Sequence, residues 1–213
     1  MSSSLLFDES PVLGILPIVA AITAYKYKYT NLAYACIVLL VCLWMFYRYT
    51  PYTKRHPDNA IVSPCEGKVV LIEDRYDHYY IPIFLSVFNK HTQIYPVNGT
   101  VVNRRYDHTG KFEIVMYLDK SVDNEKKLHH IVMNSGAVIS VTQLAGLLPR
   151  MITSSDVVPL KVSAGDYLGM IKFGSRVDLL LPKTAPDGTK LKLHPSIKAN
   201  RSISIGDSIG VYV

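Results

Sequence analysis

The stretch "GMIKFGSRVDLLLP" (residues 169–182) interrupts a strand-like apolar run with a glycine, a serine and an arginine. Gly-Ser pairs are common in turns, but here strand-like residues lie on both sides. A glycine inside a strand weakens it and often marks a bulge or a close approach of another group to the backbone. Gly174 and Ser175 are therefore a candidate functional site.

The region around this stretch has the pattern of short strands. Beyond residue 60, ten segments rich in β-branched and aromatic residues are separated by Gly, Pro, Asn or Asp. This pattern predicts an α+β fold in which residues 61–213 form a mainly-β domain. We expect small sheets or a flattened, sandwiched barrel, preceded by a hydrophobic helical hairpin.

A short internal repeat supports the β architecture. "SAGDYLGMI" (163–171) and "SIGDSIGVY" (204–212) share the pattern S-x-G-D-x-x-G. A Gly-Asp turn followed by a strand that starts near a glycine is typical of a hairpin corner, which would be used twice here. Two unrelated, ordinary turns would fit the same letters.

Two apolar runs without charges lie near the N-terminus, at residues 12–24 and 32–47. As a helix the second would be about 24 Å long, against roughly 30 Å for a bilayer core. We expect residues 1–47 to be membrane-anchoring helices, including a transmembrane helix, and residues 48–60 to be a linker. The topology stays open, and a buried helix hairpin of a soluble protein is the alternative.

Charge and cysteine content narrow the function classes. The formal net charge is +6, and basic residues follow each apolar run directly. Anionic lipid headgroups explain this placement, so a membrane location is expected and a nucleic-acid partner is not required. The three cysteines include no CxxC pair, so the sequence indicates neither a disulfide framework nor a metal site.

Three residues together suggest an activated nucleophile. His91 lies where a strand runs into a polar turn, and loops held by a sheet often carry sites. Glu66 lies in a tight Pro-x-x-Gly turn, where a solvated carboxylate is the plain alternative. With Ser175 they match the logic of serine, base and orienting carboxylate, although their separations neither support nor exclude a triad. The other histidines lie among charges or at segment ends, which is typical of surface positions.

Four segments resemble the short-type (archaeal and bacterial-like) phosphatidylserine decarboxylases. "YLGMIKFGSRVDLLLP" resembles their self-cleavage motif, and "AIVSPCEGKVV" resembles their "SPADGKV" turn. "FLSVFNKHTQIYPVNGTV" resembles their histidine loop, and "VTQLAGLLPRMI" resembles an apolar stretch that normally ends in paired arginines. With the N-terminal apolar runs, the resemblance covers nearly the whole chain.

The resemblance implies a self-processing enzyme. Ser175 would attack the Gly174 carbonyl, and the chain would separate into a large chain (1–174) and a small chain (175–213) that stay together as a heterodimer. Ser175 would become a pyruvoyl group that forms a Schiff base with phosphatidylserine, so neither a metal nor pyridoxal phosphate is needed. The product is phosphatidylethanolamine. His91 matches the family histidine, which implies a role in proton transfer or substrate contact.

The sequence departs from the family pattern at three places. Glu66 replaces an aspartate, Pro149-Arg150 replaces the paired arginines, and "FYRYTP" replaces "FFRDP". Two other classes of function therefore stay open. One is a membrane-associated scaffold, or pseudoenzyme, that has the same β domain and never cleaves, and the other is a serine hydrolase in which Ser175 remains a serine.

Overall fold

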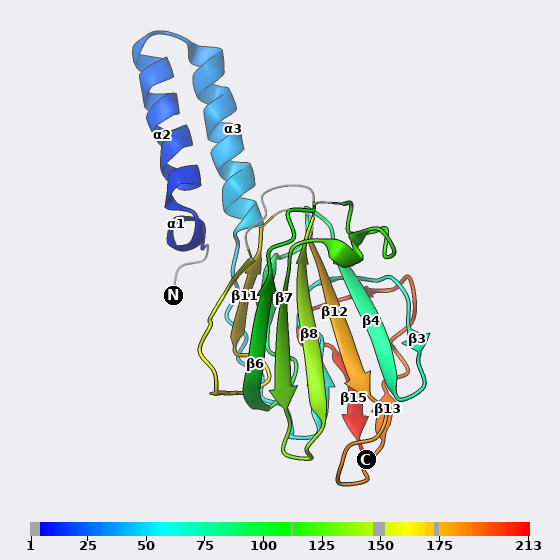
Figure 1. The fold of residues 1–213 in the computed structure, drawn as a ribbon. Coiled ribbons are helices and arrows are strands. Elements are labelled where there is room, and N and C mark those ends of the chain that lie inside the picture. Colours follow the sequence, from blue (N-terminus) through cyan, green and yellow to red (C-terminus); the bar gives the residue numbers. More distant parts are fainter. Residues whose placement is uncertain (1–4, 112, 147–151, 173–174) are drawn as a thin grey trace. The chain divides into compact units, whose positions relative to one another are not determined.

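The computed structural model describes residues 5–111, 113–146, 152–172 and 175–213 (Figure 1). The chain divides into two compact units, Met1–Pro51 and Tyr52–Val213. The first unit is helical, and the regular secondary structure described in the second consists of strands and one 3-10 turn, so the predicted mainly-β character is confirmed.

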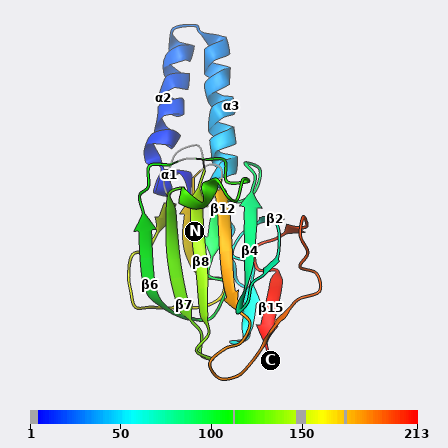
Figure 2. The same cartoon turned by 45° about the vertical axis from the view of Figure 1, so that its right-hand side comes forward.

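The N-terminal unit is a helical hairpin. A single helical turn, α1 (Leu6–Glu9), precedes α2 (Pro11–Lys26) and α3 (Thr30–Phe46), which pack side by side (Figure 2). Their residues are apolar on all sides, so packing two helices together leaves much apolar surface in contact with solvent. Large exposed side chains on both helices include Leu16, Val19, Ile22, Val38 and Trp44.

Within the described residues, no helix is long and apolar enough to cross a membrane. The two longest, α2 and α3, have 16 and 17 residues. The expected transmembrane helix is therefore not supported.

The β unit contains one large antiparallel sheet. Its strand order is β10-β6-β7-β8-β12-β4-β2-β14, and β3 pairs with β4 at one side. Figure 1 shows β6, β7, β8, β12 and β4 side by side. The bounds of these strands are β2 (Gly67–Val69), β3 (Glu73–Asp74), β4 (His78–Leu85), β6 (Gly99–Asp107), β7 (Lys126–Val132), β8 (Val138–Ala145), β10 (Leu160–Val162), β12 (Ser175–Pro182) and β14 (Ser202–Ile203).

Two three-stranded sheets complete the unit, in the orders β5-β11-β9 and β1-β15-β13. A 3-10 turn, η1 (Ser121–Asp123), precedes β7. The strands of the small sheets are β1 (Ala60–Val62), β5 (Thr92–Ile94), β9 (Ile152–Ser154), β11 (Tyr167–Ile171), β13 (Leu191–Leu193) and β15 (Ser208–Tyr212).

The main hydrophobic core joins the three sheets. Successive residues of a strand point to opposite faces, and in β12 the buried apolar positions are Val177, Leu179 and Leu181. They pack with residues from every sheet, such as Ile83, Ile171 and Ile209. Burial on this face explains why the sheet and the small sheets stay together.

The expected barrel is wrong, and the small-sheet alternative holds only in part, because two three-stranded sheets accompany one large sheet. Among the described residues the end strands of the large sheet, β10 and β14, do not pair with each other, so the sheet does not close. A pattern of short strands contains no information about which edges meet, and this is why it left both architectures open.

The internal repeat forms the same turn twice, but the expected hairpin corner is wrong, because each turn joins a strand of the large sheet (β10 or β14) to a strand of a small sheet (β11 or β15). Gly165 and Gly206 both adopt positive φ, at 104° and 79°, a region that favours glycine. Asp166 and Asp207 each accept a hydrogen bond from the backbone N–H three residues earlier, at 2.7 and 2.8 Å. The ring of Tyr52 packs against both glycines, since a Cβ on either would lie within 2.5 Å of it.

Residues 52–60 therefore contribute to the β unit although their composition resembles a linker. We predict that a chain of residues 52–213, with Ser175 replaced by alanine to keep it single, folds and unfolds cooperatively. The corresponding chain of residues 61–213 should lose about 2 kcal/mol of unfolding free energy, because the half-buried Tyr52 ring is removed. Urea unfolding measures both values.

The substitution Tyr52→Ala in the longer chain is the matched control. It should reproduce most of the loss, because the two glycine turns then face a cavity. Equal stability of the two truncated chains would contradict the role given to Tyr52.

Candidate active site

Ser175 is the first residue of β12, at the centre of the large sheet. It is fully buried and pairs with Leu85 of β4 on one edge and with Ala145 of β8 on the other. Its Oγ donates a hydrogen bond to the carbonyl oxygen of Ile171 at 3.4 Å. Gly174 and Pro149-Arg150 lie outside the described residues. Ser175 is thus held on both sides at the point where the sequence predicted a site.

His91 lies directly before β5, in the loop that follows β4, and its side chain is buried. Its Nδ1 is 2.9 Å from the carbonyl oxygen of Asn89. A carbonyl only accepts hydrogen bonds, so this contact places a proton on Nδ1. The His91 carbonyl in turn accepts from the backbone N–H of Ile171 at 3.2 Å. Ile171 therefore connects the histidine loop to Ser175, because its N–H donates to His91 and its carbonyl accepts from Ser175.

Glu66 reaches the same loop through an amide side chain. It is half-buried and accepts a hydrogen bond at 2.9 Å from Nδ2 of Asn89, the residue whose carbonyl holds His91. Asn89 Oδ1 accepts from the backbone N–H and the hydroxyl of Ser86, at 2.9 and 2.8 Å. The structure thus brings all three predicted residues to one end of the β unit, with Asn89 as a connection that sequence reasoning missed.

A buried chain of polar side chains extends from the histidine loop into the core. Gln93 in β5 donates to the His91 carbonyl at 2.6 Å, and Gln143 in β8 donates to Gln93 at 2.8 Å. His129 in β7 lies 2.9 Å from the Gln143 oxygen, so its Nε2 donates. All three side chains are fully buried. The chain connects the loop that carries His91 to the middle of the large sheet.

The surface position expected for His129 is wrong. The segment "KKLHHIV" forms β7, in which Lys127, His129 and Ile131 alternate with more exposed residues and face the core. Period-two alternation was the available signal, but charged letters obscured it. Burial lowers the pKa of His129 to about 4, and the positive charges of Arg104 and Lys127 add to this effect. His129 is therefore neutral at neutral pH.

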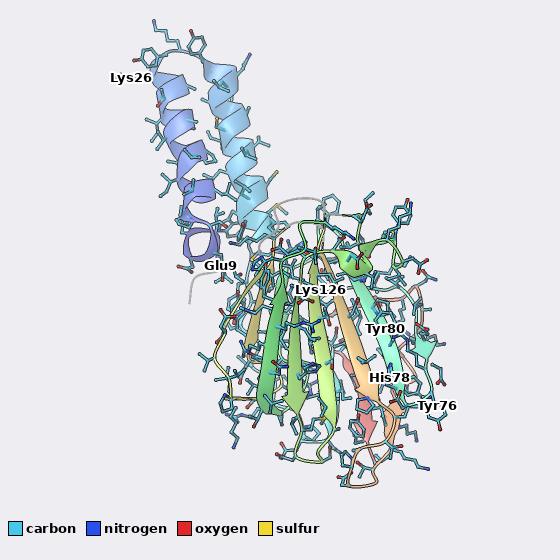
Figure 3. The ribbon with its side chains drawn as sticks, in the orientation of Figure 1. Glu9, Lys26, Tyr76, His78, Tyr80 and Lys126 are labelled. Carbon is cyan, nitrogen blue, oxygen red and sulfur yellow. The ribbon has the colours of Figure 1, made fainter. Side chains whose placement is uncertain are left out.

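A cavity of about 640 Å³ is lined by residues of β4, β7, β8 and β12, and Tyr80 and Lys126, which belong to this set, are labelled in Figure 3. Its wall also includes Arg176 and Asp178, which alternate along β12 with the core-facing Ser175 and Val177. Among the described residues, no group of three or more His, Cys, Asp or Glu side chains could hold a metal ion.

Comparisons with known proteins agree with the resemblance seen in the motifs. The family model for phosphatidylserine decarboxylase matches residues 43–211. A phosphatidylserine decarboxylase proenzyme of Cytophaga hutchinsonii is 36% identical over 163 residues, which cover 73% of each chain. That of Amoebophilus asiaticus is 33% identical and covers 77% of this chain and 76% of its own. That of Oleidesulfovibrio alaskensis is 28% identical over 93% of this chain and 89% of its own. No solved structure is significantly similar to this chain.

The buried His129 predicts a specific acid sensitivity. An unfolded histidine takes up a proton near pH 6.5, whereas the folded one resists protonation down to about pH 4. Its contribution to stability is therefore present above pH 6.5 and is lost as the pH falls toward 4, by about 3 kcal/mol in total. In the single-chain Ser175→Ala background, His129→Gln should reduce the fall in unfolding free energy between pH 7 and pH 4 by that amount. Equal pH slopes for the two proteins would contradict the burial of a neutral imidazole.

Proposed function

Because the chain belongs to the phosphatidylserine decarboxylase family and is a carboxy-lyase of that class, we propose that it works through a pyruvoyl group made from its own Ser175. The observation that carries the proposal is the burial of Ser175 at the first position of a central strand, hydrogen-bonded to the residue that also holds the His91 loop. The name of the relatives, proenzyme, supports a precursor that must be processed.

The chemistry of processing begins at the bond between Gly174 and Ser175. Ser175 Oγ attacks the Gly174 carbonyl, and the amide becomes an ester as the nitrogen leaves with the proton of the hydroxyl. Loss of the Ser175 α-proton then breaks the Cβ–O bond, which frees the carboxylate of Gly174 and leaves a dehydroalanine. Addition of water and loss of ammonia produce the terminal ketone. Large and small chains remain associated, because β12 is hydrogen-bonded to β4 and β8.

The residues around Ser175 suit a group that must be kept from bulk water. The strand end is buried, and both of its edges are occupied by neighbouring strands. When formed, a pyruvoyl ketone supplies an electron sink for the loss of carbon dioxide from the serine headgroup.

We assign His91 to proton transfer. The hydrogen bond to the Asn89 carbonyl holds a proton on Nδ1, so Nε2 is the basic nitrogen. Glu66 fixes the side chain of Asn89 and adds a negative charge to the loop, which favours a positively charged imidazole in the transition state. Glu66 is therefore a positioning residue in this proposal, and Ser175 and His91 are the reacting groups.

We place the enzyme at a membrane surface, where its lipid substrate resides. The support is the apolar surface of α2 and α3 together with the basic residues at or just beyond the end of each helix, such as Lys26, Lys28 and Arg48. Co-sedimentation with phosphatidylserine vesicles tests this placement. The full chain should pellet with vesicles in high salt, whereas residues 52–213 should remain in the supernatant. Equal pelleting would locate the attachment in the β unit.

Self-cleavage is the decisive test of the proposed function. The purified chain should have the intact masses of residues 1–174 and of residues 175–213 with a ketone in place of the N-terminal amine. Ser175→Ala should remain a single chain. A parental chain that stays intact in membranes for hours would favour the scaffold or the serine hydrolase over the decarboxylase.

The same measurement, made over time, examines Glu66. Removing its charge in Glu66→Gln should slow precursor decay by roughly 10- to 100-fold, because the negative charge that favours a positively charged imidazole in the transition state is lost. Glu66→Asp keeps the charge and should cleave at least as fast as Glu66→Gln. Cleavage of Glu66→Gln at the parental rate would show that Glu66 is only a turn residue.

A further inference from the structure

The side chain next to Ser175 is the most extensively hydrogen-bonded one in β12. Arg176 is only 2% exposed, and its Nε and Nη2 donate to the two carboxylate oxygens of Asp178 at 2.7 and 3.0 Å. Its Nη1 donates to the carbonyl oxygen of Val115 at 2.7 Å and to the hydroxyl of Ser121 at 2.6 Å. One guanidinium thus joins the start of β12 to the segment that precedes β7.

A third element completes this cluster. Tyr80 in β4 donates its hydroxyl hydrogen to Asp178 at 2.8 Å, and the Asp178 side chain is only 12% exposed. A buried ion pair contributes little net stability, because desolvation of both charges offsets their attraction. Its geometry is nevertheless restrictive, since the planar guanidinium fixes two bonds to Asp178 and two bonds to other segments at once. The arrangement therefore suits positioning better than stabilisation.

Cleavage divides this cluster between two chains. Arg176 and Asp178 would belong to the small chain, whereas Tyr80, Val115 and Ser121 would belong to the large one. Before cleavage Ser175 is held by covalent bonds on both sides, but afterwards it is a chain end, and chain ends fray unless other contacts hold them. The contacts of Arg176 cross between the chains at the residue adjacent to the reactive one.

We propose that Arg176 is a positioning residue that fixes the new N-terminus of the small chain against the large chain after self-cleavage. This inference rests on the proposed function, since it concerns a chain end that exists only if the bond before Ser175 is cut. The guanidinium is required after cleavage, when it replaces the lost covalent restraint, and is dispensable before it.

The test compares cleavage with turnover in the same variants. Arg176→Met should cleave within about threefold of the parental rate, because the precursor strand is held covalently and by both neighbouring strands. After complete cleavage its kcat for phosphatidylserine should fall by at least about 10-fold, with KM changed less than about threefold, since small displacements of a reacting group are costly. Arg176→Lys keeps the charge but lacks the planar guanidinium. Its kcat should lie between that of the parent and that of Arg176→Met.

A matched control comes from an exposed pair with the same spacing. Arg105 and Asp107 in β6 form an ion pair, and the Arg105 side chain is 65% exposed. Arg105→Met should keep the parental cleavage rate and kcat, because exposed ion pairs contribute little. A double variant, Arg176→Met with Asp178→Leu, avoids an unpaired buried carboxylate and should cleave but retain the low kcat.

Hydrogen exchange gives a readout that does not depend on activity. In the cleaved protein, the amides of residues 176–178 should exchange at least about 10-fold faster in Arg176→Met than in the parent. In the uncleaved Ser175→Ala background, the same substitution should change their exchange by less than about threefold. This difference between the two backgrounds is the signature of a restraint that matters only at a chain end.

The outcomes separate this inference from the proposed function. A parental chain that never cleaves overturns both. Parental kcat and exchange in cleaved Arg176→Met overturn only the role of Arg176. A failure of Arg176→Met and of the double variant to cleave also overturns it, because the arginine would then act in the precursor. Recovery of the parental kcat in the double variant also overturns the role of Arg176, because the unpaired Asp178 carboxylate would then have caused the fall in kcat of Arg176→Met.

Discussion

Strand β12 is hydrogen-bonded on both edges from its first residue onward, and the rest of the site depends on this constraint. Because β4 and β8 fix the backbone of Ser175, the side chains of the strand are committed to opposite faces. Ser175 and Val177 face the core, while Arg176 and Asp178 face the other side. One strand thus supplies both the candidate reactive residue and the ion pair that joins it to its surroundings.

The histidine loop depends on a second constraint, the hydrogen-bonding requirement of buried polar groups. Gln93, Gln143 and His129 would destabilise an apolar core if they were unpaired, so each bond of the chain restricts the orientation of the next group. The last bond ends on the carbonyl of His91. A polar network inside the core therefore fixes the conformation of the loop that carries His91. Apolar packing alone would allow this loop several conformations.

Sequence reasoning identified the features that are local in the chain. The strand segments, the paired Gly-Asp turns and the three candidate residues were each visible in a few neighbouring letters. It missed what depends on residues distant in sequence, since Arg176 bonds Val115 and Ser121 across the sheet and His129 meets Gln93 only through Gln143. The closure of the sheet also depends on distant edges, and for that reason the sequence does not distinguish a barrel from small sheets. The local sequence around Tyr52 resembles a linker because the two glycines that it contacts lie more than a hundred positions away.

The central position of β12 has a consequence for the lifetime of the proposed enzyme. A dissociable cofactor can leave a damaged site and be replaced, whereas a ketone at the end of a strand enclosed by β4 and β8 cannot be exchanged without unfolding the sheet. One irreversible side reaction at that atom, such as reduction or capture by a stray amine, would end the activity of the whole molecule. Catalytic capacity would then be renewed only by synthesis of new chains, and its decay would follow the chemistry of a single carbon atom and not the stability of the fold.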